Sequence, residues 1–377
     1  MKHLDRIDVL RAVAILLVFL HHAQICLFPN YRISTFNADG LLALRSIKDA
    51  LLNLSPAAFG WTGVQLFLLI SGFLIHLGFL KGEAQGSPLN IRTFLSKRFW
   101  RIYPPYLLTV LFFCFAVNGG RYLTQPDKVA DLVSHLLMVH NLSQDTFWSI
   151  NPSFWSIALE IQLYLIYPLL LFLRKKSGMH RTFLFTLLLA GAIILLNHLG
   201  LPGNFELAYK TNVFAFWYIW CAGAYLAERF HAGQPVFPKG HRSLLFSLAL
   251  FAAMCTASCV EVIHVLVVPL AVFAWMVFFE WFLRTPIPAS WEAAWPYRGL
   301  VTVGLCSYSI YLIHQPYLRT LLRYFGEYGN QPFALAVKVS VVFGILFLIS
   351  YALYQLVELP SIAHGARLRA RRKAAAN

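Results

Sequence analysis

The chain has 377 residues, of which 59% are hydrophobic and only 12% are charged, and its formal net charge is +15. Soluble globular proteins carry about 25% charged residues, so this chain lacks the polar side chains needed to cover a water-facing surface. The composition therefore excludes a soluble protein and predicts one that is mostly immersed in lipid. It also argues against nucleic acid as a partner, because the basic excess of a membrane protein collects in its cytoplasmic loops.

A helix needs about 20 mostly apolar residues to cross about 30 Å of hydrocarbon. Ten segments approach that length and predict an all-α membrane protein with about ten transmembrane helices. These segments lie near residues 8–28, 59–80, 104–118, 152–173, 182–200, 212–229, 243–260, 262–283, 299–318 and 334–357. A further apolar stretch, 135–142, is too short to cross and is expected at the membrane interface. The least certain boundary is the break near Glu261.

The basic residues predict how these helices are oriented. If the N-terminus is cytoplasmic and the crossings alternate, the inner segments hold 22 of the 31 lysine and arginine residues. This bias predicts that both termini lie in the cytoplasm. We expect one transmembrane domain over residues 1–360. Residues 361–377 are then a basic cytoplasmic tail that rests against anionic membrane lipids.

The cysteines and histidines give no sign of a metal site. The six cysteines lie inside or beside apolar runs and form no CxxC pair. No histidine and cysteine cluster has the spacing of a zinc site. We therefore expect neither a disulfide framework nor a bound metal.

The first predicted helix contains four polar residues that lipid would disfavour. Asp8 and Arg11 are three residues apart, share a helical face and can form an ion pair. His22 lies on the same face as Arg11, about 16 Å further along the axis, whereas His21 points about 100° away. Titratable groups within lipid are costly and therefore indicate function. The alternatives are an interfacial anchor for Asp8 and Arg11 and hydrogen-bonded core histidines for His21 and His22.

The fourth predicted helix contains Glu160, with Ser156 one turn before it. Glu160 and His22 lie roughly 12 and 9 Å below the outer surface, given the rise of 1.5 Å per residue. A carboxylate beside an imidazole fixes its tautomer and raises its basicity. We expect these two side chains to pair and to form a general base. A purely structural ion pair is the competing interpretation.

Three further positions are candidates for a ligand site. Arg98 and Arg101 share a helical face before the third predicted helix and can clamp a phosphate group, although they could equally be topological anchors. Ser71 and Gly72 allow close backbone approach in the second helix, which is also ordinary helix packing. His314 lies near the outer end of the ninth predicted helix.

Six sequence strings together resemble the acyltransferase-3 family of polytopic membrane O-acyltransferases. The family's opening Asp, Arg and His motif is similar to IDVLRAVAILLVFLHHA, and its paired-arginine and Ser-x-x-x-Glu motifs are similar to KRFWRIYP and FWSIALEIQLYLIYP. Its Ser-Gly-Phe segment and late motifs resemble QLFLLISGFLI, YSIYLIHQP and YQLVELP. The strings span almost the whole chain. Many members have a second acidic residue where this chain has Ile161, so only Glu160 can act as the acid.

The resemblance implies transfer of an acyl group, usually acetyl, from cytoplasmic acyl-CoA to a saccharide hydroxyl. The acceptor would be a saccharide or lipid-linked saccharide on the outer face of a bacterial cytoplasmic (inner) membrane. His22 is then the general base, oriented by Glu160. The donor would be bound by Arg98, Arg101, Arg11, Ser71 and Gly72. Further candidate site residues are Asp8, His21, Ser156 and His314.

Other functions are compatible with the same residues. His22 could be a nucleophile that forms an acyl-imidazole intermediate. A proton-coupled transporter or flippase of a glycolipid or saccharide would use the intramembrane histidine and glutamate as a proton relay, although no internal repeat is evident. A membrane receptor that catalyses no reaction would leave the buried titratable residues unexplained. The identity of the acceptor, the choice of acetyl, succinyl or longer acyl group, and the oligomeric state stay open.

Overall fold

A computed structural model describes residues 2–28, 54–87, 89–117, 121–198, 212–325 and 332–374. Within these ranges every regular element is a helix. The chain divides into two compact units, each built from three separate stretches of sequence. The first unit comprises residues 1–78, 219–307 and 318–343, and the second comprises residues 79–218, 308–317 and 344–377.

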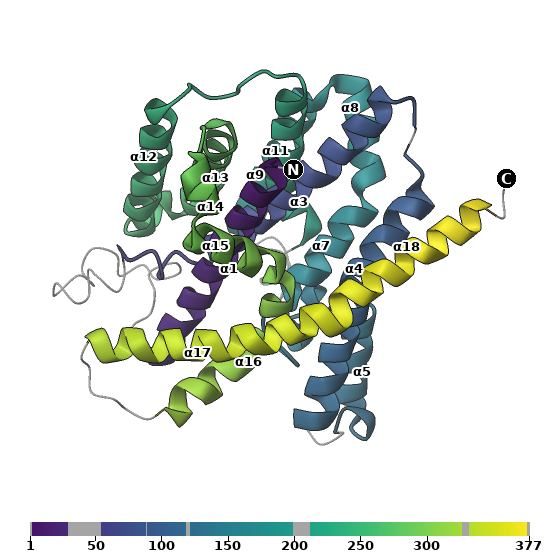
Figure 1. The fold of residues 1–377 in the computed structure, drawn as a ribbon, viewed down its shortest axis with the longest axis vertical. Helices are drawn as coiled ribbons and strands as arrows, with labels where there is room; N and C mark the ends of the chain where they lie inside the picture. Colours follow the sequence, from purple (N-terminus) through teal and green to yellow (C-terminus); the bar gives the residue numbers. More distant parts are fainter. Residues whose placement is uncertain are drawn as a thin grey trace. The chain divides into compact units, whose positions relative to one another are not determined.

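Helices from both ends of the sequence form the first unit. It contains α1 (Lys2–Leu27), α12 (His241–Ser258), the 3-10 helix η6 (Glu261–Leu266), α13 (Val267–Arg284), α14 (Ala289–Ala293) and α15 (Trp295–Leu305). It also contains parts of α3 (Thr62–Ala84), α11 (Val213–His231), α16 (Ser307–Tyr324) and α17 (Pro332–Leu353). Within this unit α1 packs along α15, and α12 packs along α13 (Figure 1).

Two glycines allow α3 and α11 to meet backbone to backbone in the first unit. A Cβ atom on Gly72 would lie 2.1 Å from the carbonyl oxygen of Trp220, and one on Gly223 would lie 2.0 Å from that of Leu69. Real Cβ atoms do not approach oxygen so closely, so each position accepts only glycine without a shift. Small residues at helix interfaces are how membrane helices pack tightly.

The second unit carries the middle of the chain and its C-terminal part. It contains α4 (Ile91–Leu111), the π-helix η3 (Phe112–Val117), η4 (Arg121–Leu123), α5 (Pro126–Leu136), η5 (His140–Leu142), α6 (Gln144–Phe147), α7 (Trp155–Leu165), α8 (Tyr167–Ser177), α9 (Met179–His198), the π-helix η7 (Tyr354–Glu358) and α18 (Leu359–Ala374). The rest of α3, α11, α16 and α17 belongs to this unit as well.

The connection between α4 and α7 folds back along α4. The Tyr103 hydroxyl donates to the carbonyl of Leu136 at 3.1 Å, and the Tyr106 hydroxyl donates to the carbonyl of His135 at 3.0 Å. Both tyrosines lie near the middle of the 27-residue helix Ile91–Val117. The end of α5 therefore packs beside the middle of that helix, and the interfacial position expected from the sequence stays a prediction.

Seven helices of the described residues are long and apolar enough to cross a membrane, and the number is eight if the pair α7 and α8, bent by 48°, is counted as one crossing. These correspond to eight of the ten predicted segments. Of the other two, 212–229 forms α11, whereas 299–318 is divided at Cys306 between α15 and α16. The break predicted near Glu261 is occupied by η6. The class of helical membrane protein is confirmed, whereas ten crossings and the orientation of the termini stay predictions.

Candidate functional site

The predicted ion pair of α1 forms in the first unit. Arg11 Nη1 donates to Asp8 Oδ1 at 3.2 Å, and both side chains are largely buried. One helical turn separates the two residues, as their spacing requires. The pair compensates both charges in a place where an isolated charge would be costly.

The two adjacent histidines of α1 have different environments. His21 is buried, and its Nδ1 lies 3.0 Å from the carbonyl oxygen of Ala57. This bond fits the core-histidine interpretation of His21. His22 is half-buried, and its ring centre lies 5.6 Å from that of His21.

Ser71 and Gly72 lie at the contact between α3 and α11. The Trp220 indole nitrogen donates to the Ser71 hydroxyl at 3.4 Å, and the Trp220 backbone fills the space beside Gly72. Both residues thus take part in helix packing within the first unit. A role in the passage of a ligand stays a prediction.

The first unit also holds a histidine–glutamate contact that the sequence does not predict. His76 Nε2 of α3 lies 3.1 Å from Glu228 Oε1 of α11, and the His76 side chain is fully buried. The two residues are 152 positions apart. Hydropathy alone carries no signal for such a pair, because each partner is a single polar residue in a different helix.

In the second unit, one tyrosine connects the paired-arginine string to the Ser-x-x-x-Glu string. The Tyr164 hydroxyl donates to the Glu160 carboxylate one turn earlier on α7. The guanidinium carbon of Arg98 lies 5.7 Å from the centre of the Tyr164 ring and 5.8 Å from that of Phe94. A cation over an aromatic face is attracted by the ring quadrupole. Arg98 and Glu160 are therefore neighbours of the same aromatic side chain, and Arg101 follows Arg98 by one turn.

The beginning of α7 is tied to α16. The Ser156 hydroxyl forms a hydrogen bond of 2.6 Å with the hydroxyl of Tyr311. His314 is fully buried, and its Nδ1 lies 2.9 Å from the carbonyl oxygen of Tyr311. Asn151 donates to the carbonyl of Leu312 at 2.8 Å. Ser156 and His314 thus lie in one hydrogen-bonded region of the second unit.

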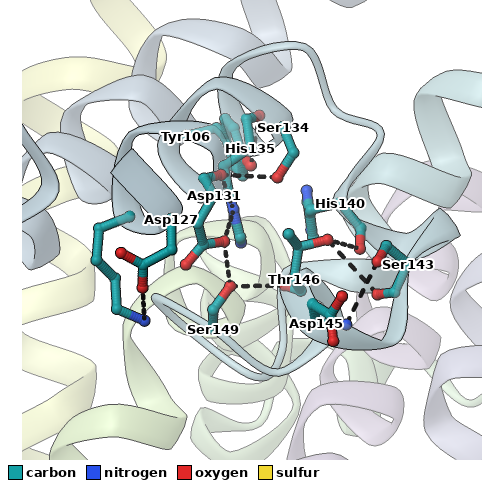
Figure 2. A network of polar contacts seen from close by, with 11 residues as sticks. Tyr106, Asp127, Asp131, Ser134, His135, His140, Ser143, Asp145, Thr146 and Ser149 are labelled. Atoms are coloured by element: carbon teal, nitrogen blue, oxygen red, sulfur yellow. Dashed lines mark hydrogen bonds and ion pairs between the residues drawn. The ribbon is translucent and has the colours of Figure 1, made fainter. Parts of the chain in front are cut away.

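A buried polar network fills the fold between α5 and α7 (Figure 2). His135 Nδ1 lies 2.9 Å from the carbonyl oxygen and 3.2 Å from the carboxylate of Asp131. The Ser149 hydroxyl donates to the same carboxylate, and the Thr146 hydroxyl donates to the carbonyl of His140 at 2.8 Å. The sequence analysis did not identify this network, because its members lie in a stretch that hydropathy assigns to a connection.

Two imidazoles of this network stack face to face. The ring centres of His135 and His140 are 3.9 Å apart, and the ring planes differ by 6°. Neither ring nitrogen of His140 makes a hydrogen bond of ordinary geometry. Burial, reinforced by the neighbouring His135, lowers the pKa of His140 to about 3. His140 is therefore a neutral ring at physiological pH.

A second pair of contacts fixes the network to α7. The Gln162 side-chain amide donates to Asn141 Oδ1 at 2.7 Å and to the carbonyl of Met138 at 3.2 Å. Gln162 lies two residues after Glu160. The fold between α5 and α7 is thus part of the surroundings of the helix that carries the predicted acid. Across the described residues, no three His, Cys, Asp or Glu side chains are arranged to hold a metal ion.

The predicted site residues are divided between the two units. Those of the first unit are Asp8, Arg11, His21, His22, Ser71 and Gly72. Those of the second unit are Arg98, Arg101, Ser156, Glu160 and His314. The pairing of His22 with Glu160 therefore stays a prediction. The contacts of Tyr164 in the second unit bring the arginine string and the glutamate string together.

Comparison with known proteins covers nearly the whole chain. The family described as an acyltransferase domain matches residues 4–355. Peptidoglycan O-acetyltransferase OatA of Listeria monocytogenes is 29% identical over 302 residues, which are 74% of this chain and 48% of that protein. Putative peptidoglycan O-acetyltransferase YrhL of Bacillus subtilis is 27% identical over 366 residues, which are 89% of this chain and 56% of that protein.

A putative O-acetyltransferase of Staphylococcus aureus is 23% identical over 184 residues, which are 45% of this chain and 25% of that protein. The chain spans about half the length of the Listeria and Bacillus relatives. No solved structure matches it.

Proposed function

Because the chain belongs to the acyltransferase family that matches residues 4–355, we propose that it is a membrane O-acyltransferase. It moves an acyl group, acetyl in the simplest case, from acyl-CoA to a hydroxyl of a saccharide or lipid-linked saccharide. The observation that carries the proposal is the contact of Tyr164 with both Arg98 and Glu160. Through this contact Arg98, a cation that can bind a phosphate-bearing donor, lies near Glu160, an acid that can take part in catalysis. Two relatives named as peptidoglycan O-acetyltransferases, one of them putative, support a cell-wall saccharide as acceptor.

The proposed reaction needs a base and no metal. A thioester is already activated, whereas a sugar hydroxyl is a poor nucleophile until its proton is removed. His22 takes that proton, and the oxygen forms a bond to the thioester carbonyl carbon. The carbon–sulfur bond then breaks, and the thiolate of coenzyme A takes the proton from His22. Glu160 orients the imidazole and stabilises its protonated form.

The donor is held by its phosphates and by its narrow acyl-pantetheine arm. Arg98 and Arg101 bind phosphate, because a guanidinium group matches the geometry of phosphate oxygens. Arg11, kept in place by Asp8, lies on the face of α1 that leads to His22 and guides the arm, which passes along the helix that carries Ser71 and Gly72. His21, Ser156 and His314 hold the surrounding backbone through the hydrogen bonds described above.

This chemistry requires a defined orientation in the membrane. We propose ten crossings over residues 1–360 and a basic tail over 361–377, with both termini in the cytoplasm of a bacterium and the acceptor on the opposite face. Acyl-CoA then approaches the first half of the helix Ile91–Val117, which carries Arg98 and Arg101. The positive-inside bias supports this orientation.

A histidine substitution tests the proposal directly. The His22→Ala protein, purified in lipid nanodiscs, should transfer acyl groups to soluble peptidoglycan fragments about 10²- to 10⁴-fold more slowly. Its affinity for acyl-CoA should be unchanged. Release of free coenzyme A and mass spectrometry of the saccharide product provide the measurement. His231→Ala, at an exposed position on α11, is the matched control.

Each alternative predicts a different result. Near-normal acyl transfer by His22→Ala would show that His22 is not the general base. An acylated protein trapped from donor alone would show that His22 acts as a nucleophile. Movement of saccharide across the bilayer without release of coenzyme A would identify a transporter or flippase.

A further inference from the structure

The C-terminal helix α18 lies against α4 within the second unit (Figure 1). A Cβ atom on Gly365 would lie 2.5 Å from Cγ of Trp100, so only glycine permits this approach without a shift. The rings of Trp100 and His364 have centres 4.7 Å apart. The two helices thus touch at the residue that directly precedes Arg101.

Beyond this contact, α18 continues toward the start of α4. Glu358, the residue before α18, accepts a hydrogen bond from α16, and α16 also donates to the carbonyl of Ile102. Gly365 then meets Trp100, so α18 advances toward lower-numbered residues of α4. Arg369 follows Gly365 by four residues, which places it on the same helical face about 6 Å further along. This spacing is expected to place it beside the first half of α4.

The two helices carry basic side chains and no acidic ones. Their basic residues are Arg92, Lys97, Arg98, Arg101, Arg367, Arg369, Arg371, Arg372 and Lys373. Within the described part of the chain, neither Arg98 nor Arg369 forms an ion pair with a carboxylate. The positive charges of Arg98 and Arg369 are therefore not paired directly with a carboxylate of the described residues.

Two of these arginines have buried nitrogen atoms without a hydrogen-bond partner, namely Arg98 Nε and Arg369 Nη1. A buried donor without an acceptor is unfavourable, and more so when it is charged. Arg367, Arg371 and Arg372 are instead exposed to the surroundings of the protein. Arg98 and Arg369 are therefore the arginines of this junction for which an anionic ligand offers the largest gain.

We propose that Arg369 extends the donor site by binding the 3′-phosphate of acyl-CoA. The inference rests on the proposed function, in which Arg98 and Arg101 bind donor phosphates. Acyl-CoA carries a diphosphate next to its pantetheine arm and a separate phosphate on the ribose. With the arm directed inward, the diphosphate reaches Arg98 and Arg101, and the ribose phosphate lies further out. Arg369 is the α18 side chain that reaches this outer position.

Anionic lipid offers the same phosphate chemistry to a basic helix. The exposed arginines of α18 suit a lipid headgroup, because they can follow a mobile surface. Arg369 is half-buried and its Nη1 is fully buried, which suits a ligand held at a fixed position. The two sources of phosphate make different predictions for a donor that lacks only the 3′-phosphate.

The test compares acetyl-CoA with acetyl-3′-dephospho-CoA by calorimetric titration of the full chain in nanodiscs. The discs contain phosphatidylcholine alone or with phosphatidylglycerol. The wild-type protein should bind acetyl-CoA about 10-fold more tightly than the dephospho compound, since one charge-assisted phosphate contact is worth at least about 1.4 kcal/mol. Arg369→Gln should abolish this preference by weakening acetyl-CoA alone. Arg371→Gln, two residues further along α18 and exposed, should keep it.

The outcomes separate this inference from the proposed function. The role of Arg369 is overturned if Arg369→Gln still prefers acetyl-CoA over the dephospho compound. It is also overturned if Arg371→Gln loses this preference to the same extent. An effect of Arg369→Gln that is confined to phosphatidylglycerol discs also overturns it and identifies a lipid contact. Arg98→Gln should weaken both compounds. If Arg98→Gln changes neither while Arg369→Gln abolishes the preference, the proposed placement of the diphosphate fails and the 3′-phosphate contact stands.

Discussion

Tyr164 contacts two side chains of opposite charge through different parts of one ring. Its hydroxyl donates to Glu160, and the ring lies 5.7 Å from the guanidinium carbon of Arg98. The hydrogen bond limits the orientation of the carboxyl group, whereas the ring limits the positions of the arginine. Because the two contacts use separate atoms, substitution can remove one and keep the other.

Tyr164→Phe should lower kcat about 10-fold and leave the donor affinity unchanged, because it removes only the hydrogen bond to Glu160. Tyr164→Leu should also weaken donor binding, because Arg98 loses the aromatic face. Steady-state kinetics with varied acyl-CoA, together with equilibrium titration of the donor, measures both quantities. A Phe variant with weaker donor binding and normal kcat would contradict this division of roles.

His140 predicts how stability depends on pH. The unfolded chain protonates this histidine below about pH 6.5, whereas the folded protein does so only near its pKa of about 3. Between these values the unfolded state binds more protons, so the free energy of unfolding falls as the pH falls. The expected slope from this one group is roughly 1.4 kcal/mol per pH unit.

His140→Gln should reduce that slope, and thermal unfolding of the purified protein between pH 4 and pH 8 measures it. His241→Gln, which changes an exposed histidine at the start of α12, should leave the slope unchanged. Equal slopes in the wild-type protein and His140→Gln would show that the stacked pair is not what makes acid destabilising.

At the scale of elements, the contact between α3 and α11 depends on the absence of two side chains. Gly72 and Gly223 each face a backbone carbonyl of the other helix. The same α3 carries Gly78, around which there is no neighbouring atom within 4 Å of a Cβ position. One helix therefore contains a tightly packed glycine and an unrestrained one.

Gly72→Ala should destabilise the protein by about 1–3 kcal/mol or more, because the added methyl group forces the helices apart. Gly78→Ala should be neutral or stabilising by up to about 1 kcal/mol, since alanine favours the helix over glycine. Thermal unfolding and the yield of monodisperse protein in detergent distinguish them. Equal effects at both positions would mean that the α3–α11 contact is not maintained in solution.

For the whole molecule, hydropathy and charge predict the helical membrane class and eight of the ten expected segments. The spacing of Asp8 and Arg11 also predicts their ion pair, because both residues lie on one helix. Contacts such as His76 with Glu228 could not be predicted, because they depend on which helices become neighbours. The break at Cys306 was missed because an average over 20 residues does not register a local change of backbone direction.

The stack of His135 and His140 escaped prediction for a related reason. Its stretch of sequence is too short for a crossing, and nothing in composition alone indicates that α5 returns along α4. For the candidate site, the motif strings single out Arg98 and Glu160, whose roles stay predictions. Tyr164, which links them, looked like an ordinary aromatic residue of a membrane helix.

The proposed orientation predicts which face of the membrane each residue lies on, and therefore which residues a membrane-impermeant reagent can label. Cysteine introduced at Asp145, exposed in α6, should react with a membrane-impermeant maleimide in intact cells that carry a variant lacking the native cysteines. Cysteine introduced at Arg181, exposed at the start of α9, should react only after lysis. A C-terminal green fluorescent protein should be fluorescent. The reverse labelling pattern would invert the orientation and place Arg98 away from cytoplasmic acyl-CoA.

The run from Phe333 to Arg372 is one helix of 40 residues, seen in Figure 1 as the long yellow rod formed by α17 and α18. At 1.5 Å per residue it is about 60 Å long, roughly twice the thickness of the hydrocarbon layer. Its apolar part is α17, whose 22 residues are about 33 Å long and match a hydrocarbon layer of about 30 Å. A bilayer of different thickness should therefore change the tilt of α17, because the basic α18 cannot enter the hydrocarbon to make up a difference in length.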